Sequence, residues 1–119
     1  MASGAADPTP ESFLPLTAAV FHILLALADG GKHGYAIMRE VEKETAGAVR
    51  MGPGTLYGSL DRMIEAGLIE EAPSPGRDAD PRRRYYRMSD LGRRVARQEA
   101  GRLAKSVRAA KAKRLFLPA

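Results

Sequence analysis

The side chains able to do chemistry in this chain of 119 residues are few and far apart. The chain has no cysteine and two histidines, His22 and His33, so it lacks the cluster of ligands that a zinc site requires. The segment 52–55 (GPGT) lacks the lysine and the spacing of a phosphate-binding loop. No nucleophile with a nearby base and no paired carboxylates can be assembled. We therefore expect no enzyme activity, no metal and no cofactor.

A second group of side chains can form hydrogen bonds with the edges of nucleic-acid bases. A helix that begins at Pro53 would place its apolar residues at i, i+4, i+7 and i+8 and leave a face of short, polar or aromatic groups outward. That outward face carries Thr55, Tyr57, Gly58, Ser59, Asp61 and Arg62. Electrostatic coating of DNA would need only lysine and arginine, so this face favours reading of bases.

Positive charge is concentrated toward the C-terminus. The whole chain carries +5, yet residues 1–76 hold five basic against ten acidic side chains, and residues 77–119 hold fourteen basic against four acidic ones. This asymmetry is typical of a surface that binds nucleic acid. The alternative interpretation is a solvated polar face with no partner.

The elements that must position these groups follow from periodicity and from breakers. Apolar spacing predicts a helix over 13–28 that Asp29 and the next two glycines end, and a second helix from about 34 to 45. On the second helix, the expected inner stripe is Tyr35, Met38, Val41 and Thr45. A third helix runs from Pro53 to Gly67, which ends it.

Two short strands, 68–72 and 82–88, flank a breaker-rich basic loop at 73–81, and Tyr86 is expected in the core. Ser89 then caps a helix that continues to about residue 114. This order predicts a mainly α fold with a small β-hairpin, a winged helix-turn-helix followed by a long C-terminal dimerisation helix. We divide the chain into a disordered N-terminal arm (1–11), a DNA-binding domain (12–88), a dimerisation helix (89–115) and a tail (116–119).

The last helix carries a heptad-like seam of mostly small apolar residues. Spacings of four and three residues separate Ala96, Ala100, Leu103, Val107 and Ala110. The seam could pack on the first helix of its own domain, but a helix of this length projects past a small domain, which favours a homodimer. We add Leu16 and Val20 of the first helix to the predicted interface. The basic side chains around the seam either contact DNA or keep the dimer soluble.

Three blocks of sequence resemble the PadR family of transcriptional regulators: KHGY, MGPGTLYGSLDRMIEAGLIEE and RRRYYRMSDLGRR. The resemblance covers roughly residues 14–101. It implies a bacterial, homodimeric winged-helix regulator, usually a repressor, that binds a palindromic operator in double-stranded DNA near its own or a neighbouring transporter or detoxification gene. It also implies that a small phenolic or drug-like effector can release the DNA, as in many family members.

By the same resemblance, DNA contact is assigned to the tyrosine of HGY, to the GPGTLY block and to the arginines of the wing. Together with the outward face and the basic loop, the predicted DNA-binding residues are Tyr35, Pro53, Gly54, Thr55, Tyr57, Ser59, Arg62, Arg77, Arg82, Arg83 and Arg84. Lys32 stands where a proline often precedes HGY in the family, and this departure should affect packing. The C-terminus resembles the single-helix version of the family.

A second interpretation keeps the fold and changes the role. In that interpretation the chain is an interaction module that binds a protein, or binds nucleic acid without choosing a sequence. The longest apolar stretch, 20–28, is much shorter than the roughly 20 residues that span a bilayer. Residues 1–10 have no basic segment before an apolar one, as a secretory signal would. We expect a cytoplasmic protein with no membrane contact.

Overall fold

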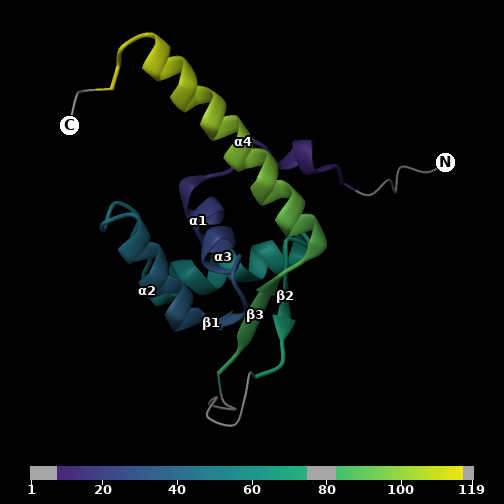
Figure 1. Cartoon of the computed structure of the whole chain (residues 1–119). Helices are drawn as coiled ribbons and strands as arrows, with labels where there is room; N and C mark the ends of the chain where they lie inside the picture. The colour runs from purple at the N-terminus through teal and green to yellow at the C-terminus, as the bar shows by residue number, and fades with distance from the viewer. Residues whose placement is uncertain (1–7, 75–82, 117–119) are drawn as a thin grey trace, which may run out of the picture.

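The computed structural model describes residues 8–74 and 83–116 of the chain (Figure 1). Its helical elements are a short 3-10 turn η1 (Pro10–Phe13) and the helices α1 (Ala18–Ala26), α2 (Gly34–Glu44), α3 (Pro53–Glu65) and α4 (Asp90–Ala112). Its strands are β1 (Lys32–His33), β2 (Ile69–Ala72) and β3 (Tyr85–Met88), which form one antiparallel sheet in the order β1-β3-β2. The predicted fold class is confirmed.

The first helix begins five residues later than its apolar spacing predicted. Pro15 has no N–H group, and Thr17 caps the helix by accepting a hydrogen bond at Oγ1 from the Val20 N–H over 3.2 Å. Pro10 and Glu11, expected in a disordered arm, form the start of η1. The rest of that arm, 1–7, and the end of the predicted tail, 117–119, lie outside the described residues.

The buried stripe of α2 agrees with the predicted one at Val41 and lies one position earlier at its other two members. Gly34, Ile37 and Val41 are buried, whereas Tyr35 is half exposed. The stripe is displaced because the glycine, rather than the tyrosine, lies against α3. The prediction that Tyr35 faces the core is therefore wrong.

The sheet has a third strand that the sequence did not predict. β1 is only two residues long, too short to show alternation, and pairs Lys32 with Tyr86 and His33 with Tyr85. Its presence makes β3 the central strand. Tyr86 is fully buried, as predicted, and Tyr85 is buried too because the His33 ring packs edge-on against it at 5.6 Å between ring centres.

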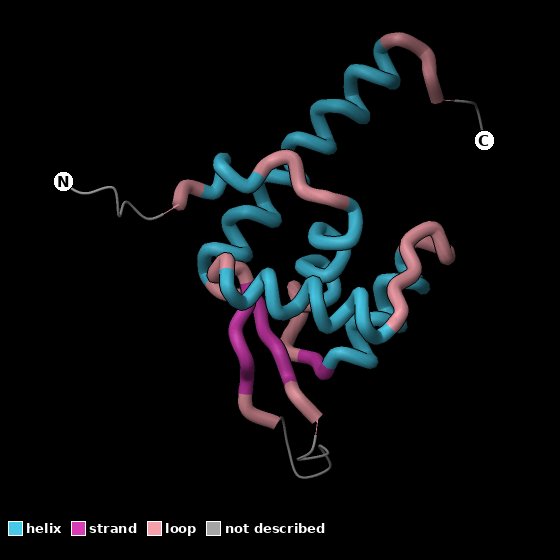
Figure 2. Tube along the Cα trace, turned by 180° about the vertical axis from the view of Figure 1, so that it is seen from behind, coloured by secondary structure: helices cyan, strands magenta, loops and turns pink. Residues whose placement is uncertain are grey.

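The N-terminal part of helix α4 packs against the rest of the fold, and its C-terminal part projects away from it. Ser89 caps it as predicted, since its Oγ accepts from the Gly92 N–H over 2.9 Å and donates to the Gly67 carbonyl over 2.6 Å. Gly92 lies so close to the Leu68 carbonyl that a Cβ there would be 2.0 Å from the oxygen. Beyond this contact, α4 extends toward one end of the molecule and the β2–β3 hairpin toward the other (Figures 1 and 2).

One buried carboxylate fixes the direction of α4. The side chain of Glu99 is 2% exposed, and its Oε2 accepts a hydrogen bond from the Leu16 N–H over 2.8 Å. The Arg102 guanidinium donates to both oxygens of the same carboxylate, at 2.5 and 3.1 Å. The middle of α4 is thereby joined to the segment that leads into α1.

We predict that Glu99→Gln lowers the melting temperature and reduces the loss of stability in acid. The hydrogen bond from Arg102 holds the pKa of Glu99 below its ordinary value of 4.5. The ionised carboxylate therefore stabilises the fold fully above that pH, and this stabilisation is lost as the pH falls through the folded pKa. Thermal melts by circular dichroism at about pH 7 and about pH 3.5 measure the difference.

The exposed Glu65 of α3 is the matched control, because Glu65→Gln removes the same charge without touching the buried pair. If acid lowered the melting temperature of Glu99→Gln as much as that of the wild type, the prediction would be contradicted.

Candidate nucleic-acid interface

Strand β1 leads directly into α2, and this junction joins the sheet to the helices. The Nδ1 atom of His33 accepts a hydrogen bond from the Ala36 N–H over 3.1 Å and so caps α2. Its Nε2 lies 2.7 Å from Nη1 of Arg83, which precedes β3 at the loop end of the hairpin. Tyr35 follows on the exposed side, with the Arg39 guanidinium 5.7 Å from its ring centre. This junction places a phenol and two arginines on one surface.

The phenol ring of Tyr57 rests on the backbone of Gly34. A Cβ at Gly34 would lie 2.6 Å from the Tyr57 hydroxyl oxygen and 2.8 Å from two ring carbons. No side chain fits between them, so this glycine sets how closely α3 approaches the start of α2. Tyr57 remains 39% exposed on its other side.

The N-terminal end of α3 is open to solvent. Gly52, Pro53, Gly54 and Thr55 are all exposed, and Gly52 at the cap position offers no side chain to the first N–H groups. An uncapped helix start presents those N–H groups and the positive end of the helix dipole to an anion. A groove of about 420 Å³ between α2 and α3 opens beside it, with Tyr35, Arg39 and Arg50 in its wall.

Two predicted DNA-binding residues lie elsewhere on α3. Ser59 is buried rather than outward-facing, and Arg62 donates a hydrogen bond to its Oγ over 3.3 Å. Both line an apolar groove of about 260 Å³ together with Phe13, Leu16 and Val20. The structure thus groups Ser59 and Arg62 with the predicted interface residues of the first helix rather than with Tyr35.

The hairpin strands carry compensated charge. Arg84 donates two hydrogen bonds to Glu71, at 3.2 and 3.1 Å, and lies 3.9 Å from Asp61 of α3. Arg87 pairs in the same way with Glu70 over 3.0 Å. Arg83 is exposed at the loop end of the hairpin, beside His33, whereas the predicted contacts Arg77 and Arg82 lie outside the described residues. The described positive excess is greatest on α4, with seven basic and two acidic side chains.

The predicted seam begins at Ala96, which packs against the core, and continues onto the projecting part of α4. Ala96 and Ala110 are partly exposed, and Ala100, Leu103 and Val107 are exposed. In the single chain, α4 contacts η1 and α1 only through its first half. The second half of the seam therefore has an apolar face without a covering element among the described residues.

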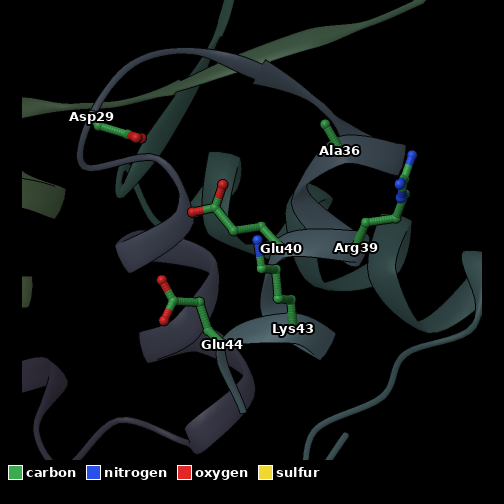
Figure 3. A pocket seen from close by; sticks show the side chains of 6 residues that line it. All are labelled: Asp29, Ala36, Arg39, Glu40, Lys43 and Glu44. Atoms are coloured by element: carbon green, nitrogen blue, oxygen red, sulfur yellow. The ribbon is translucent and has the colours of Figure 1, made fainter. Parts of the chain in front are cut away.

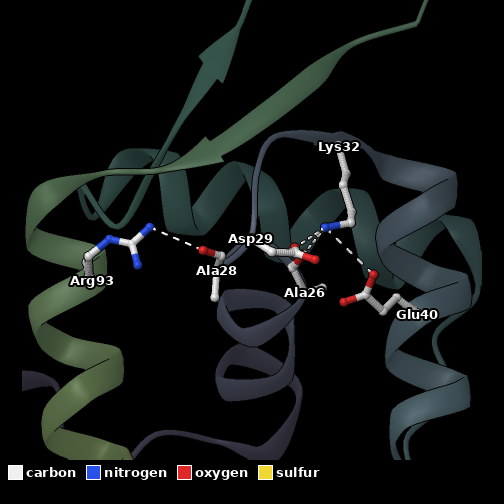
Figure 4. Close-up of polar contacts among 6 residues, drawn as sticks. All are labelled: Ala26, Ala28, Asp29, Lys32, Glu40 and Arg93. Atoms are coloured by element: carbon white, nitrogen blue, oxygen red, sulfur yellow. Dashed lines mark hydrogen bonds and ion pairs between the residues drawn. The ribbon is translucent and has the colours of Figure 1, made fainter. Parts of the chain in front are cut away.

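Lys32 anchors the short strand β1 to the end of α1 (Figure 4). Its ammonium group donates to the Ala26 carbonyl and to Asp29, both over 2.5 Å, and lies 3.7 Å from Glu40 of α2. Arg93 of α4 reaches the neighbouring Ala28 carbonyl over 3.4 Å. Lys32 therefore joins β1 to α1 and α2 through polar contacts, and the effect on packing of a lysine in place of the family's proline stays a prediction.

A further hollow is lined by side chains of both charge signs. It measures about 710 Å³ and is lined by Asp29, Ala36, Arg39, Glu40, Lys43 and Glu44 (Figure 3). Its opposite charges lie close together and compensate one another, which suits neither an anion nor an apolar molecule. Within 8–74 and 83–116, no three acidic or histidine side chains are grouped to hold a metal, and no helix is long and apolar enough to cross a membrane.

The arrangement of an exposed α3, a neighbouring turn and a hairpin agrees with the family comparison. The model of the "Transcriptional regulator PadR-like family" matches residues 23–98. The chain belongs to the PadR-like family. The match contains the HGY turn, all of α3 and the sheet, which are the elements just described.

Solved structures of PadR-like regulators share this fold. A PadR family regulator from hypervirulent Clostridium difficile has a TM-score of 0.65 at 18% identity, with 81% of this chain and 97% of that chain covered. RosR from H. salinarum has a TM-score of 0.61 at 29% identity, covering 78% and 79%. Bacillus subtilis PadR in complex with operator DNA has a TM-score of 0.59 at 19% identity, covering 71% and 46%.

A curated relative from Streptomyces fradiae, an uncharacterised 37.1 kDa protein in transposon TN4556, is 36% identical over 83 residues. The match covers 70% of this chain and 22% of the length of that protein.

We predict that Gly34→Ala separates α2 from α3 and destabilises the fold by about 1–3 kcal/mol, because the new methyl group collides with the Tyr57 ring. Urea unfolding followed by circular dichroism measures the change in the free energy of unfolding.

Gly101→Ala in α4 is the matched control, since a Cβ there meets nothing within 4 Å. That substitution should stabilise the helix by up to about 1 kcal/mol. Equal stability of Gly34→Ala and the wild type would contradict the packing argument.

Proposed function

We propose that this PadR-like regulator is a sequence-specific DNA-binding repressor that acts as a homodimer on a palindromic operator, near its own or a neighbouring transporter or detoxification gene. The observation that carries the proposal is the exposed N-terminal end of α3, with Tyr35 and Tyr57 beside it and Arg83 at the loop end of the hairpin. A major groove about 12 Å wide accepts such a helix end.

The arrangement of charge supports base contacts by α3 and phosphate contacts by the arginines around it. The exposed start of α3 offers Thr55 and backbone N–H groups rather than lysine or arginine, which suits hydrogen bonds to base edges. Arg39 and Arg50 beside the groove, and Arg83 on the hairpin, can contact phosphates and fix the position of the helix. The related B. subtilis PadR is described in complex with operator DNA, which favours the same role here.

A second copy of the chain is the partner we propose for α4. Leu103 and Val107 expose apolar side chains on the part of the helix that projects from the body. The groove that contains Phe13, Leu16 and Val20 lies near the same helix, because η1 and α1 both pack on α4. Two copies related by a two-fold axis would cover both apolar surfaces and present two α3 helices.

Release by a small aromatic or drug-like effector is part of this proposal. The apolar groove of about 260 Å³ is of a suitable size and character for one aromatic ring. An effector there would contact α3 through Met63 and Ser59, and so could alter the element that reads DNA.

We expect selection from a random DNA pool to return a two-fold symmetric motif, with half-sites about 10–10.5 base pairs apart or a multiple of that spacing. Thr55→Ala should weaken binding to the selected duplex by about 1–3 kcal/mol and bind random DNA as the wild type does. Fluorescence anisotropy with both duplexes measures the two affinities.

Arg83→Ala is the contrasting variant, because loss of a phosphate contact should weaken binding to both duplexes and flatten the salt dependence. Recovery of no motif would favour the interaction module without sequence choice over the repressor.

For the dimer, we predict that Leu103→Glu places a charge in the seam and yields a monomer in sedimentation equilibrium. Lys105→Glu, on the basic face of the same helix, is the control that changes charge away from the seam. A Leu103→Glu protein that still sediments as a dimer would contradict the assignment of the interface.

A further inference from the structure

His33 lies where three elements of the candidate interface meet. Its ring is half-buried on β1, against the edge of Tyr85. The Ala36 N–H of α2 points at Nδ1 over 3.1 Å, and Nη1 of Arg83 approaches Nε2 to 2.7 Å. One imidazole therefore contacts both the first turn of α2 and the loop end of the hairpin.

A hydrogen bond in which the ring is the acceptor requires an uncharged ring. A neutral imidazole has one nitrogen with a free lone pair, so it can accept fully from only one of the two donors at a time, according to its tautomer. A protonated imidazole has no lone pair and accepts from neither. Its positive charge would also stand beside the Arg83 guanidinium.

From this geometry we infer that His33 is a positioning residue for DNA binding: its neutral ring accepts a hydrogen bond from the Ala36 N–H or from Arg83, according to its tautomer, and protonation of His33 removes that bond, places two positive charges side by side and weakens DNA binding. The inference rests on the proposed function. It adds a dependence on proton concentration to the candidate interface.

The surroundings of the ring agree with this. The charged and titratable groups nearest to it are Arg83 and Tyr85 beside the ring, Lys32 on its own strand, and Tyr57 of α3 against the adjacent Gly34. The Lys32 ammonium is itself held by Asp29 and Glu40. No ion pair between a carboxylate and the ring occurs among the residues described, so nothing described there favours the protonated form.

The pKa of His33 is lowered, first by burial and then by the charge of Arg83. The ring is therefore neutral in the folded chain at neutral pH. As the pH falls below the ordinary histidine value of about 6.5, the unfolded chain takes up the proton first. The contribution of neutral His33 is complete above that pH and is lost as the pH falls through the folded pKa.

The direction in which acid changes the affinity for DNA distinguishes this inference from a role of His33 as a surface charge. An additional positive charge beside a phosphate strengthens DNA binding by counterion release. If His33 served only as a surface charge, acid would raise the affinity. Loss of the hydrogen bond that the ring accepts, together with repulsion between the protonated ring and Arg83, predicts the opposite.

A measurement without DNA tests the coupling itself. In ¹H–¹⁵N spectra recorded from about pH 8 down to about pH 5.5, the Ala36 amide and the Arg83 Nε–H should shift with one shared midpoint below 6.5. His33→Asn removes the titrating group and keeps a side-chain oxygen that can cap α2, so both shifts should vanish while the fold is retained. Shifts that persist in His33→Asn would overturn the inference.

A second measurement tests the effect on DNA. Wild-type affinity for the duplex recovered by selection should fall at least about threefold on acidification over that range, and His33→Asn should show no such fall. His22→Gln removes the other histidine and should keep the wild-type dependence. In an Arg83→Ala background, replacing His33 should have little further effect on the pH dependence of the affinity for DNA.

The two failures are distinguishable. A wild-type protein that selects no DNA sequence at about pH 8 contradicts the proposed function, and the spectra still decide whether His33 couples the two elements. A protein that binds its selected duplex equally well at both ends of the pH range, or more tightly in acid, contradicts the inference about His33 alone.

Discussion

The contact between the Gly34 backbone and the Tyr57 ring is the constraint on which the interface depends. It fixes the distance between α2 and α3, and it leaves the opposite side of the ring accessible. This contact also fixes the orientation of the residues on either side of Gly34. His33 must cap α2 while facing the hairpin, and Tyr35 must point outward. A single residue without a side chain thus aligns three parts of the molecule.

Charge is arranged differently in three dimensions from its order along the chain. The strands of the hairpin pair their arginines with Glu70 and Glu71, so the hairpin is less positive than its arginine-rich sequence suggests. Exposed ion pairs of this kind contribute little stability and can exchange partners when a phosphate approaches. The uncompensated charge lies on α4, on the side of the molecule away from the hairpin.

The sequence predicted the ends of helices correctly where a single residue type, such as a proline or a capping serine, determines them. Pro53 starts α3 and Ser89 caps α4, as expected from the sequence. Contacts between distant segments could not be predicted in this way. Ser59 is buried on the side of α3 where it lines a groove with Phe13, and β1 exists only through its pairing with β3. The role of His33 was also missed, although a histidine directly before the first turn of a helix is a signal for capping.

The attachment of α4 at Glu99 makes this helix a lever. Its 23 residues correspond to a rod of about 34 Å, held near its midpoint by the Leu16 N–H. A rotation of a few degrees at that pivot would be magnified at the far end, where the partner of a proposed dimer would join. Spacing between the two halves of an operator could thus diverge among relatives through changes around the pivot, while the residues that meet the bases stay the same.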